Sequence, residues 1–279
     1  MKRTSFYITV GLAILLTGFS SCSGEKKPVN GRTDTPTSGT IEFYADESFS
    51  PVINELKEQF EFKYPKAHLV PHYTNEIEGL QTLKDMKTCL LITSRGLLPS
   101  EISYFKSKRQ LPQVFPIGYD GLALIVNKAN NDTCITVNDV KRVLSGQAKD
   151  WSDIVPGSKR GEIEVVFDTK HYVVDSILGG KPIDAPNVVA AKTSKDVIEY
   201  VDQTPNAIGV IGSNWLNDRR DSTNTTFQKD IHVMSVSIKD NATPMNSWKP
   251  YQAYLLDGRY PFARTLYCII VDPQKGLPN

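Results

Sequence analysis

Residues 39–56, GTIEFYADESFSPVINEL, decide the fold because they pass from a strand pattern to a helix pattern across one polar turn. Apolar side chains alternate over residues 40–45, as in a half-buried strand, and they recur at helical spacing over residues 51–63. Pro51 suits the first helical position, and Ser50 suits the capping position before it. Because the start of a helix presents unpaired backbone N–H groups, residues 46–50 are predicted either to cap the helix or to hold an anion.

Strand and helix patterns alternate along the rest of the chain. A T-x-x-D capping box at Thr136 begins one helix, which ends near Gly146. This alternation predicts an α/β fold with mostly parallel sheets, in which ligands bind at turns after the carboxyl ends of strands. Three of these turns are polar, namely residues 46–50, 93–95 and 168–171. Further strands are predicted at residues 68–73, 89–93, 113–127, 162–167, 188–190, 207–211, 231–238 and 264–271, and further helices at 77–86, 100–109, 172–178 and 194–202.

The N-terminus has the pattern of a secretory signal. Lys2 and Arg3 precede an apolar run over residues 7–19, which is shorter than the roughly 20 residues that a membrane span needs. Small side chains then lead to Cys22, as in the lipobox of bacterial lipoproteins; the alternative is an ordinary signal peptide with a chance cysteine. We predict a lipoprotein signal peptide at residues 1–21, acylation of Cys22, and a flexible tether at residues 22–38 that is rich in Ser, Thr, Pro, Gly and charge.

Size and charge limit the possible functions. Removal of the 21 signal residues from 279 leaves 258, a length that suits two medium-sized lobes. The same removal lowers Lys+Arg from 32 to 30 against 31 Asp+Glu, so the mature net charge is near −1. A chain so balanced lacks the basic surface that nucleic-acid binding requires. An anionic ligand must therefore be held by local geometry.

Catalytic and metal-binding signatures are scarce. The sequence has no G-x-S-x-G, H-E-x-x-H or Walker A motif, and no nucleophile–base–orienter set is visible. His68 and His72 share a strand face, but Pro71 and the lack of nearby acidic ligands favour ordinary half-exposed histidines over a metal site. Cys89, Cys134 and Cys268 form no C-x-x-C pair. One disulfide between two of them is possible, and the sequence does not decide which two would pair. We predict no enzymatic activity, no metal and no cofactor.

Two positions stand out as possible anion ligands. Ser48 offers a hydroxyl and an N–H group at a helix start, where the helix dipole is positive. Arg95 follows a buried strand and offers a planar fork for an oxyanion; the alternative is that it pairs with a local acid such as Glu101. For Asp46 and Glu47, a capping role is at least as well supported as a ligand role.

Five segments together resemble the PstS-type phosphate-binding proteins of ABC importers: GTIEFYADESFSPVINELKEQFEFKYPKAHL, ITSRGLLPSE, PIGYDGLALIVNK, ITVNDVKRVLSGQAKDWSDI and TPNAIGVIGSNWL. The resemblance is to a lipoprotein branch of that family and runs from about residue 39 to the C-terminus. It implies the type 2 periplasmic binding protein fold, with two α/β lobes joined by two crossing strands that close on a ligand. Lobe one would comprise residues 39–119 plus 230–279 and lobe two residues 120–229, with crossings near Asp120 and residues 231–238.

The resemblance also implies a set of ligand contacts. In this sequence they fall on Ser48, Phe49, Thr74, Asn75, Ser94, Arg95 and Asp120. The sequence departs from the family after residues 162–167, where a hydroxyl-rich turn of lobe two is about five residues shorter and Thr169 and Lys170 would have to substitute. A second departure is the early stop at DPQKGLPN, which is expected to expose apolar surface. We therefore expect micromolar or weaker phosphate binding, with Arg95 as the most sensitive residue.

The resemblance thus implies a lipid-anchored, extracytoplasmic solute-binding protein that takes phosphate or a similar small oxyanion. Its partners would be an ABC transporter permease and, through the lipid, the membrane, with the periplasmic face favoured; no nucleic acid is expected, and the protein would be a monomer. The alternative is a degenerate PstS-like lipoprotein that acts as an interaction or structural module or binds another small ligand. An extracellular hydrolase is the least favoured possibility.

Overall fold

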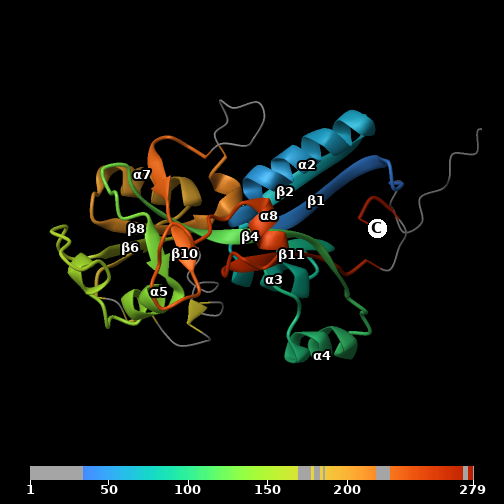
Figure 1. Cartoon of the computed structure of the whole chain (residues 1–279). Coiled ribbons are helices and arrows are strands. Elements are labelled where there is room, and N and C mark those ends of the chain that lie inside the picture. Colours follow the sequence, from blue (N-terminus) through green and yellow to red (C-terminus); the bar gives the residue numbers. More distant parts are fainter. Residues whose placement is uncertain are drawn as a thin grey trace, which may run out of the picture.

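The computed structural model describes residues 34–168, 177–178, 183–184, 186–217, 227–272 and 276–278. Within these residues the chain forms two α/β lobes side by side, and strand β4 passes between them (Figure 1). A nine-stranded sheet continues through the described part of both lobes in the order β2-β1-β3-β11-β4-β8-β6-β7, with β9 also paired to β4. The predicted α/β class is confirmed.

Lobe one is built around three parallel strands. β1 (Ser38–Asp46) lies between β2 (Lys66–Thr74) and β3 (Leu90–Thr93). β2 is an edge strand, the kind of position in a sheet where a proline such as Pro71 is tolerated. The helices are α2 (Ser50–Lys63) on one side of the sheet, and α3 (Glu76–Lys84) and α4 (Pro99–Ser107) on the other (Figure 1). All six elements agree with the sequence prediction to within a few residues.

Two apolar clusters hold these helices to the sheet. Phe49 and Ile53 pack with Phe43, Ala45 and Leu266 on the α2 side. The opposite side buries side chains of α3, α4 and β3 together with two from the strand segment at residues 263–271, namely Leu80, Leu83, Leu91, Phe105, Ile269 and Val271. The predicted apolar face of α2 is only partly buried, because Leu56 is 53% exposed.

The long strand β4 (Gln113–Asn127), predicted with these bounds, belongs to both lobes. Its first half pairs antiparallel with β11 (Ala263–Ile270), which also pairs with β3. Its second half pairs with β8 (Ala207–Gly212) and β9 (Ile231–Val233). β4 is therefore the first of the crossing strands that the resemblance implied.

Lobe two surrounds a second parallel group, in which β6 (Glu164–Phe167) pairs with β7 (Val188–Ala190) and β8. Helix α5 (Val137–Leu144) covers one side and α7 (Ser194–Gln203) the other, each over its own buried cluster. The predicted helix cap at Thr136 is confirmed, since its Oγ1 accepts the Asp139 N–H at 2.9 Å, and the Asp139 carboxylate accepts the Thr136 hydroxyl at 2.7 Å. Gly146 follows α5 with φ +70°, a conformation that ends helices. The 3-10 turn η2 (Trp151–Asp153) follows.

The predicted strand at residues 231–238 is wrong as a single crossing strand. It is broken at the buried Met234 into β9 and β10 (Ser235–Ser237), and β10 pairs with β5 (Cys134–Thr136) in a separate two-stranded sheet. The next segment, including α8 (Gln252–Leu256), places Leu255, Tyr260 and Phe262 in the lobe-two core. The Phe262 carbonyl accepts the Leu122 N–H at 2.8 Å. We therefore propose that the second crossing lies at residues 262–264 and that lobe two extends to residue 262.

Several predictions fall on residues outside the described ranges. These are the signal peptide, Cys22 and most of the tether, and the helix expected at residues 172–178 except for its last two residues. In the part of the chain that the structure describes, no helix has both the length and the apolar character needed to cross a membrane.

Candidate ligand-binding site

The polar turn at residues 46–50, hereafter the corner segment, lies at the carboxyl end of β1. Asp46 pairs with Thr74 at the end of β2, and β3 ends beside them, so three polar turns of lobe one share one edge of the sheet. The corner caps itself: Asp46 Oδ1 accepts the Ser48 N–H at 3.0 Å and begins the 3-10 turn η1 (Glu47–Phe49). α2 then begins at Ser50, one residue earlier than predicted, so Ser50 is not its cap.

The corner segment is in contact with lobe two. The 3-10 turn η4 (Ser213–Trp215) follows β8, and two of its side chains donate to the Ser48 carbonyl, from Asn214 Nδ2 at 2.9 Å and from Trp215 Nε1 at 3.1 Å. Ser48 is 1% exposed. The corner is therefore closed by lobe two in this structure.

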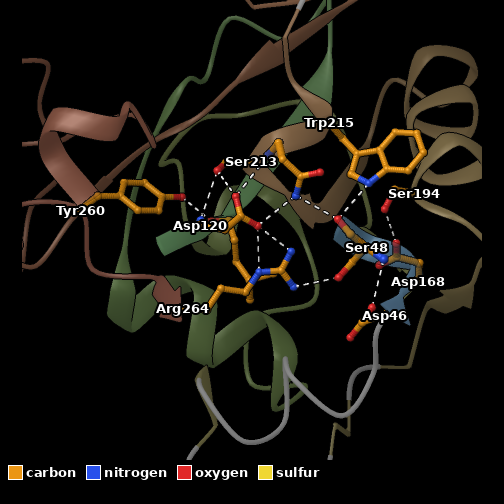
Figure 2. A network of polar contacts seen from close by, with 12 residues as sticks. Asp46, Ser48, Asp120, Asp168, Ser194, Ser213, Trp215, Tyr260 and Arg264 are labelled. Carbon is orange, nitrogen blue, oxygen red and sulfur yellow. Dashed lines mark hydrogen bonds and ion pairs between the residues drawn. The ribbon is translucent and has the colours of Figure 1, made fainter. Parts of the chain in front are cut away.

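A buried ion pair between Asp120 of β4 and Arg264 of β11 lies behind the corner (Figure 2). Arg264 of β11 donates to Asp120 Oδ2 from Nη2 at 2.6 Å and from Nε at 2.9 Å, and from Nη1 to Ser48 Oγ at 3.2 Å. Its guanidinium carbon lies 4.2 Å from the centre of the Phe49 ring. The Arg264 side chain is fully buried. Such a charge is tolerated only when it is paired and hydrogen-bonded.

Asp120 also binds lobe two. Its Oδ1 accepts the Ser213 hydroxyl and the Asn214 N–H at 3.2 Å, and its Oδ2 accepts Asn214 Nδ2 at 3.1 Å. Gly212 makes room for this network, since a Cβ there would lie 2.4 Å from Arg264 Nη2. Asp120 thus lies between the lobes, but its carboxylate accepts hydrogen bonds from Arg264 and from residues of lobe two.

Carboxylates gather where α7 of lobe two meets the corner. Burial, and then the charge of Asp168, raise the pKa of Glu47 to about 7, while the Ser194 N–H acts in the opposite direction by donating to this carboxylate. Asp46 and Asp196 raise it further. The Ser194 hydroxyl donates to Asp168 (Figure 2). Burial also raises the pKa of Asp46, against the opposing effects of Arg264 and Ser48.

Arg95 is occupied by local acids, the alternative that the sequence left open. It donates to both carboxylate oxygens of Glu101, at 2.9 and 3.0 Å, and from Nε to Glu76 at 2.8 Å. The pKa of Glu101 is lowered: burial opposes the change, but the hydrogen bonds from Arg95 and Leu98 outweigh it. The Ser94 hydroxyl also donates to Glu76, at 2.9 Å. The fork that was expected to receive an oxyanion is therefore engaged with carboxylates.

The structure describes three of the other residues that were predicted to contact the ligand, namely Phe49, Thr74 and Asn75. Thr74 and Asn75 lie at the same edge as the corner, but the Thr74 hydroxyl donates to Glu78, and Asn75 caps α3 by accepting the Glu78 N–H at 3.0 Å. Phe49 is fully buried, so its ring serves the core and Arg264. Thr169 and Lys170 lie outside the described residues.

Sequence reasoning missed Arg264 and residues 213–215. A signal existed for both. Residues 213–215 follow a buried parallel strand, as do the polar turns at 46–50, 93–95 and 168–171 that were selected from the sequence. Arg264 is the one charged residue in the predicted strand at 264–271. Among the described residues there is no cluster of three or more His, Cys, Asp or Glu that could hold a metal ion. His72 instead contacts Glu42 at 3.1 Å and stacks on Tyr44.

The chain belongs to the family described as the PBP superfamily domain, whose model matches residues 30–279. It is similar to the phosphate-binding protein PstS of Staphylococcus saprophyticus, with 22% identity over 272 residues, which cover 96% of this chain and 79% of the relative.

Two solved structures share the fold. One is a substrate-binding protein of Clostridium perfringens with bound phosphate, with a TM-score of 0.68, 18% identity, and coverage of 83% of this chain and 86% of the other. The second is an ABC-type phosphate transport receptor of Vibrio cholerae, with a TM-score of 0.60, 19% identity, and coverage of 84% and 87%. The type 2 periplasmic binding protein fold is confirmed. These relatives are named as binding proteins or receptors, in agreement with the expectation that the chain is not an enzyme.

Proposed function

We propose that this chain is an extracytoplasmic solute-binding protein that delivers inorganic phosphate to the permease of an ABC importer. The observation that carries the proposal is the Ser48 corner, a hydroxyl at a helix start that contacts a buried arginine between two lobes. Small oxyanions suit such a place, because hydroxyl and N–H donors that have a buried guanidinium behind them can hold an anion without a basic surface. The names of the relatives support phosphate as the ligand.

Binding at Ser48 requires the lobes to separate first. The hydroxyl is almost fully buried, and lobe two covers it through Asn214 and Trp215. Opening would break the two hydrogen bonds to the Ser48 carbonyl, and closure on phosphate would restore them or replace them with ligand contacts. Hinge closure of this kind is a common motion of two-lobed binding proteins.

Calorimetry with phosphate, sulfate and a panel of small sugars tests the proposal. We expect phosphate to bind with micromolar or weaker affinity, since the shortened lobe-two turn offers fewer charge-assisted hydrogen bonds than the family pattern. Sugar binding without phosphate binding, or no binding at all, would contradict the proposal. The second outcome would favour the interaction module.

Glu47 should make phosphate binding depend on pH. With its pKa raised to about 7, by burial first and then by Asp168, Glu47 is mostly neutral at pH 6 and mostly ionised at pH 8. An ionised Glu47 repels a bound anion, so the affinity should fall as the pH rises through this window, by about threefold or more.

The control is Glu47→Gln, which stays neutral throughout. Phosphate itself titrates in the same range, so the quantity to compare is the ratio of dissociation constants at pH 8 and pH 6. The wild type should give the larger ratio. Equal ratios in the two proteins would exclude Glu47 as the titrating group.

Lipid anchoring at Cys22 forms part of the proposal and rests on the sequence pattern alone. We expect Cys22→Ser to abolish acylation and to release the protein from the membrane fraction, as measured by fractionation and mass spectrometry of the N-terminus. Ser23→Ala serves as the control. A Cys22→Ser protein that is still processed and membrane-bound would show that the anchor lies elsewhere.

A further inference from the structure

We propose that Arg264, held in place by Asp120, is the positioning residue of the ligand corner and acts through Ser48 without touching the ligand. This inference rests on the proposed function for its ligand, but its geometric part can be tested in the ligand-free protein. Neither residue of the pair was expected in this role, since Asp120 was predicted as a cleft-lining residue and Arg264 only as part of a strand.

The guanidinium of Arg264 is fixed on three sides. Asp120 Oδ2 accepts from Nε and Nη2, Ser48 Oγ accepts from Nη1, and the centre of the Phe49 ring lies 4.2 Å from the guanidinium carbon. Two hydrogen bonds to one carboxylate, a third to Ser48 and the ring contact together set the position and the tilt of the guanidinium. A lysine cannot reproduce this geometry, because its ammonium is a single point of charge.

This placement gives the Ser48 hydroxyl a fixed direction. Because Oγ accepts from Arg264, its own proton must be donated elsewhere. In the ligand-free corner the neighbouring carboxylate is that of Asp46, whose Oδ1 accepts the Ser48 N–H at 3.0 Å; burial raises the pKa of Asp46, and the Ser48 side chain opposes that rise. An oxyanion that enters the corner would compete for that proton, and it would find a donor already polarised by a cation. Charge-assisted donors of this kind are the stronger ones.

The same pair connects the corner to lobe two. Asn214 Nδ2 donates both to Asp120 Oδ2 and to the Ser48 carbonyl, and Ser213 donates to Asp120 Oδ1. The lobe-two turn η4 is thus oriented by the carboxylate that orients Arg264. One buried pair therefore positions the ligand hydroxyl of lobe one and the covering turn of lobe two.

The cation also balances the charge of the corner. Burial raises the pKa values of Asp46 and Glu47, and the charge of Asp168 raises both further, while Asp46 and Asp196 on α7 add to the effect on Glu47. Arg264 opposes this for Asp46, whose pKa it lowers. Without a cation behind Ser48, an entering anion would meet carboxylates from both lobes.

The test uses Arg264→Lys, with Arg142→Gln as the control. Arg142 lies on α5, which covers the side of lobe two opposite α7, and it pairs with Asp139 at 2.9 Å. In the ligand-free proteins, amide hydrogen exchange of residues 46–50 should be at least tenfold faster in Arg264→Lys than in the wild type, with α5 unchanged. Unchanged exchange at residues 46–50 would overturn the positioning role.

Phosphate affinity supplies the second readout. Arg264→Lys should weaken binding at least tenfold, whereas Arg142→Gln should not change it. In a Ser48→Ala background the additional loss from Arg264→Lys should be less than threefold, because the residue acts through Ser48. Fully additive losses would mean that Arg264 contacts phosphate directly, and they would overturn the proposal.

The two proposals fail in different ways. If the wild type binds no phosphate but exchange at residues 46–50 responds to Arg264→Lys, the proposed function fails and the positioning role stands. If Arg264→Lys does not fold, Asp120→Asn replaces it, since it keeps the shape of the pair and removes the charge that holds the guanidinium. The same exchange and affinity changes are expected from Asp120→Asn, and their absence would overturn the positioning role.

Discussion

Asp120→Ala is expected to lower the free energy of unfolding by about 3–5 kcal/mol, because it leaves the buried Arg264 charge without its partner. The side chains of both residues are almost completely buried, and Asp120 accepts hydrogen bonds from lobe two as well. For a chain of this size the melting temperature should fall by about 6–20 °C. Chemical unfolding followed by circular dichroism measures the change.

Asp240→Ala is the matched control, since this exposed aspartate of lobe two should change stability by less than about 0.5 kcal/mol. The isosteric Asp120→Asn should fall between the two, because it retains the shape and some hydrogen bonds. If Asp120→Ala proves as stable as the wild type, the ion pair has no structural importance in solution, and Arg264 must find another arrangement.

Phe49→Ala is expected to destabilise the protein by about 3–5 kcal/mol, the usual cost of removing a fully buried phenylalanine. Phe49 is 0% exposed, packs in the α2-side cluster of lobe one, and lies against the Arg264 guanidinium. The loss should be accompanied by weaker phosphate binding, because the ring helps to fix the guanidinium behind Ser48. Urea unfolding and calorimetry measure the two effects.

Phe62→Ala, in the helix α2 that follows Phe49, is the control. Phe62 is 89% exposed, so its removal should change neither stability nor binding measurably. A Phe49→Ala protein with wild-type stability would contradict the buried position of the ring. Lost stability with unchanged phosphate affinity would separate the core role of Phe49 from any role at the corner.

Most of the fold could be predicted because it depends on local patterns. The β1–turn–α2 segment follows from alternation, a polar turn and Pro51, and the long apolar run at Gln113–Asn127 has the bounds of β4. The failure at residues 231–238 has a physical cause. An apolar strand pattern shows that a segment is buried and extended, but it does not reveal that Met234 separates two strands with different partners.

The candidate site was less predictable because it depends on pairing between distant residues. Arg95 follows an apolar strand and Arg264 begins one, and the neighbouring sequence does not show which of the two is near the corner. In the structure, Arg95 meets Glu76 and Glu101 within its own lobe, whereas Arg264 meets Asp120, 144 residues away along the chain. The position of Ser48 at a helix start was predictable, since a polar turn followed by a helical pattern can be recognised in the sequence.

A crystal structure of the phosphate complex would show whether the ligand binds at Ser48, in front of the Asp120–Arg264 pair. We predict phosphate between the lobes in hydrogen-bond contact with Ser48, with the Asp120–Arg264 pair intact behind it and Arg95 still bound to Glu101. Phosphate bound at Arg95, or at a surface remote from the corner segment, would contradict this account.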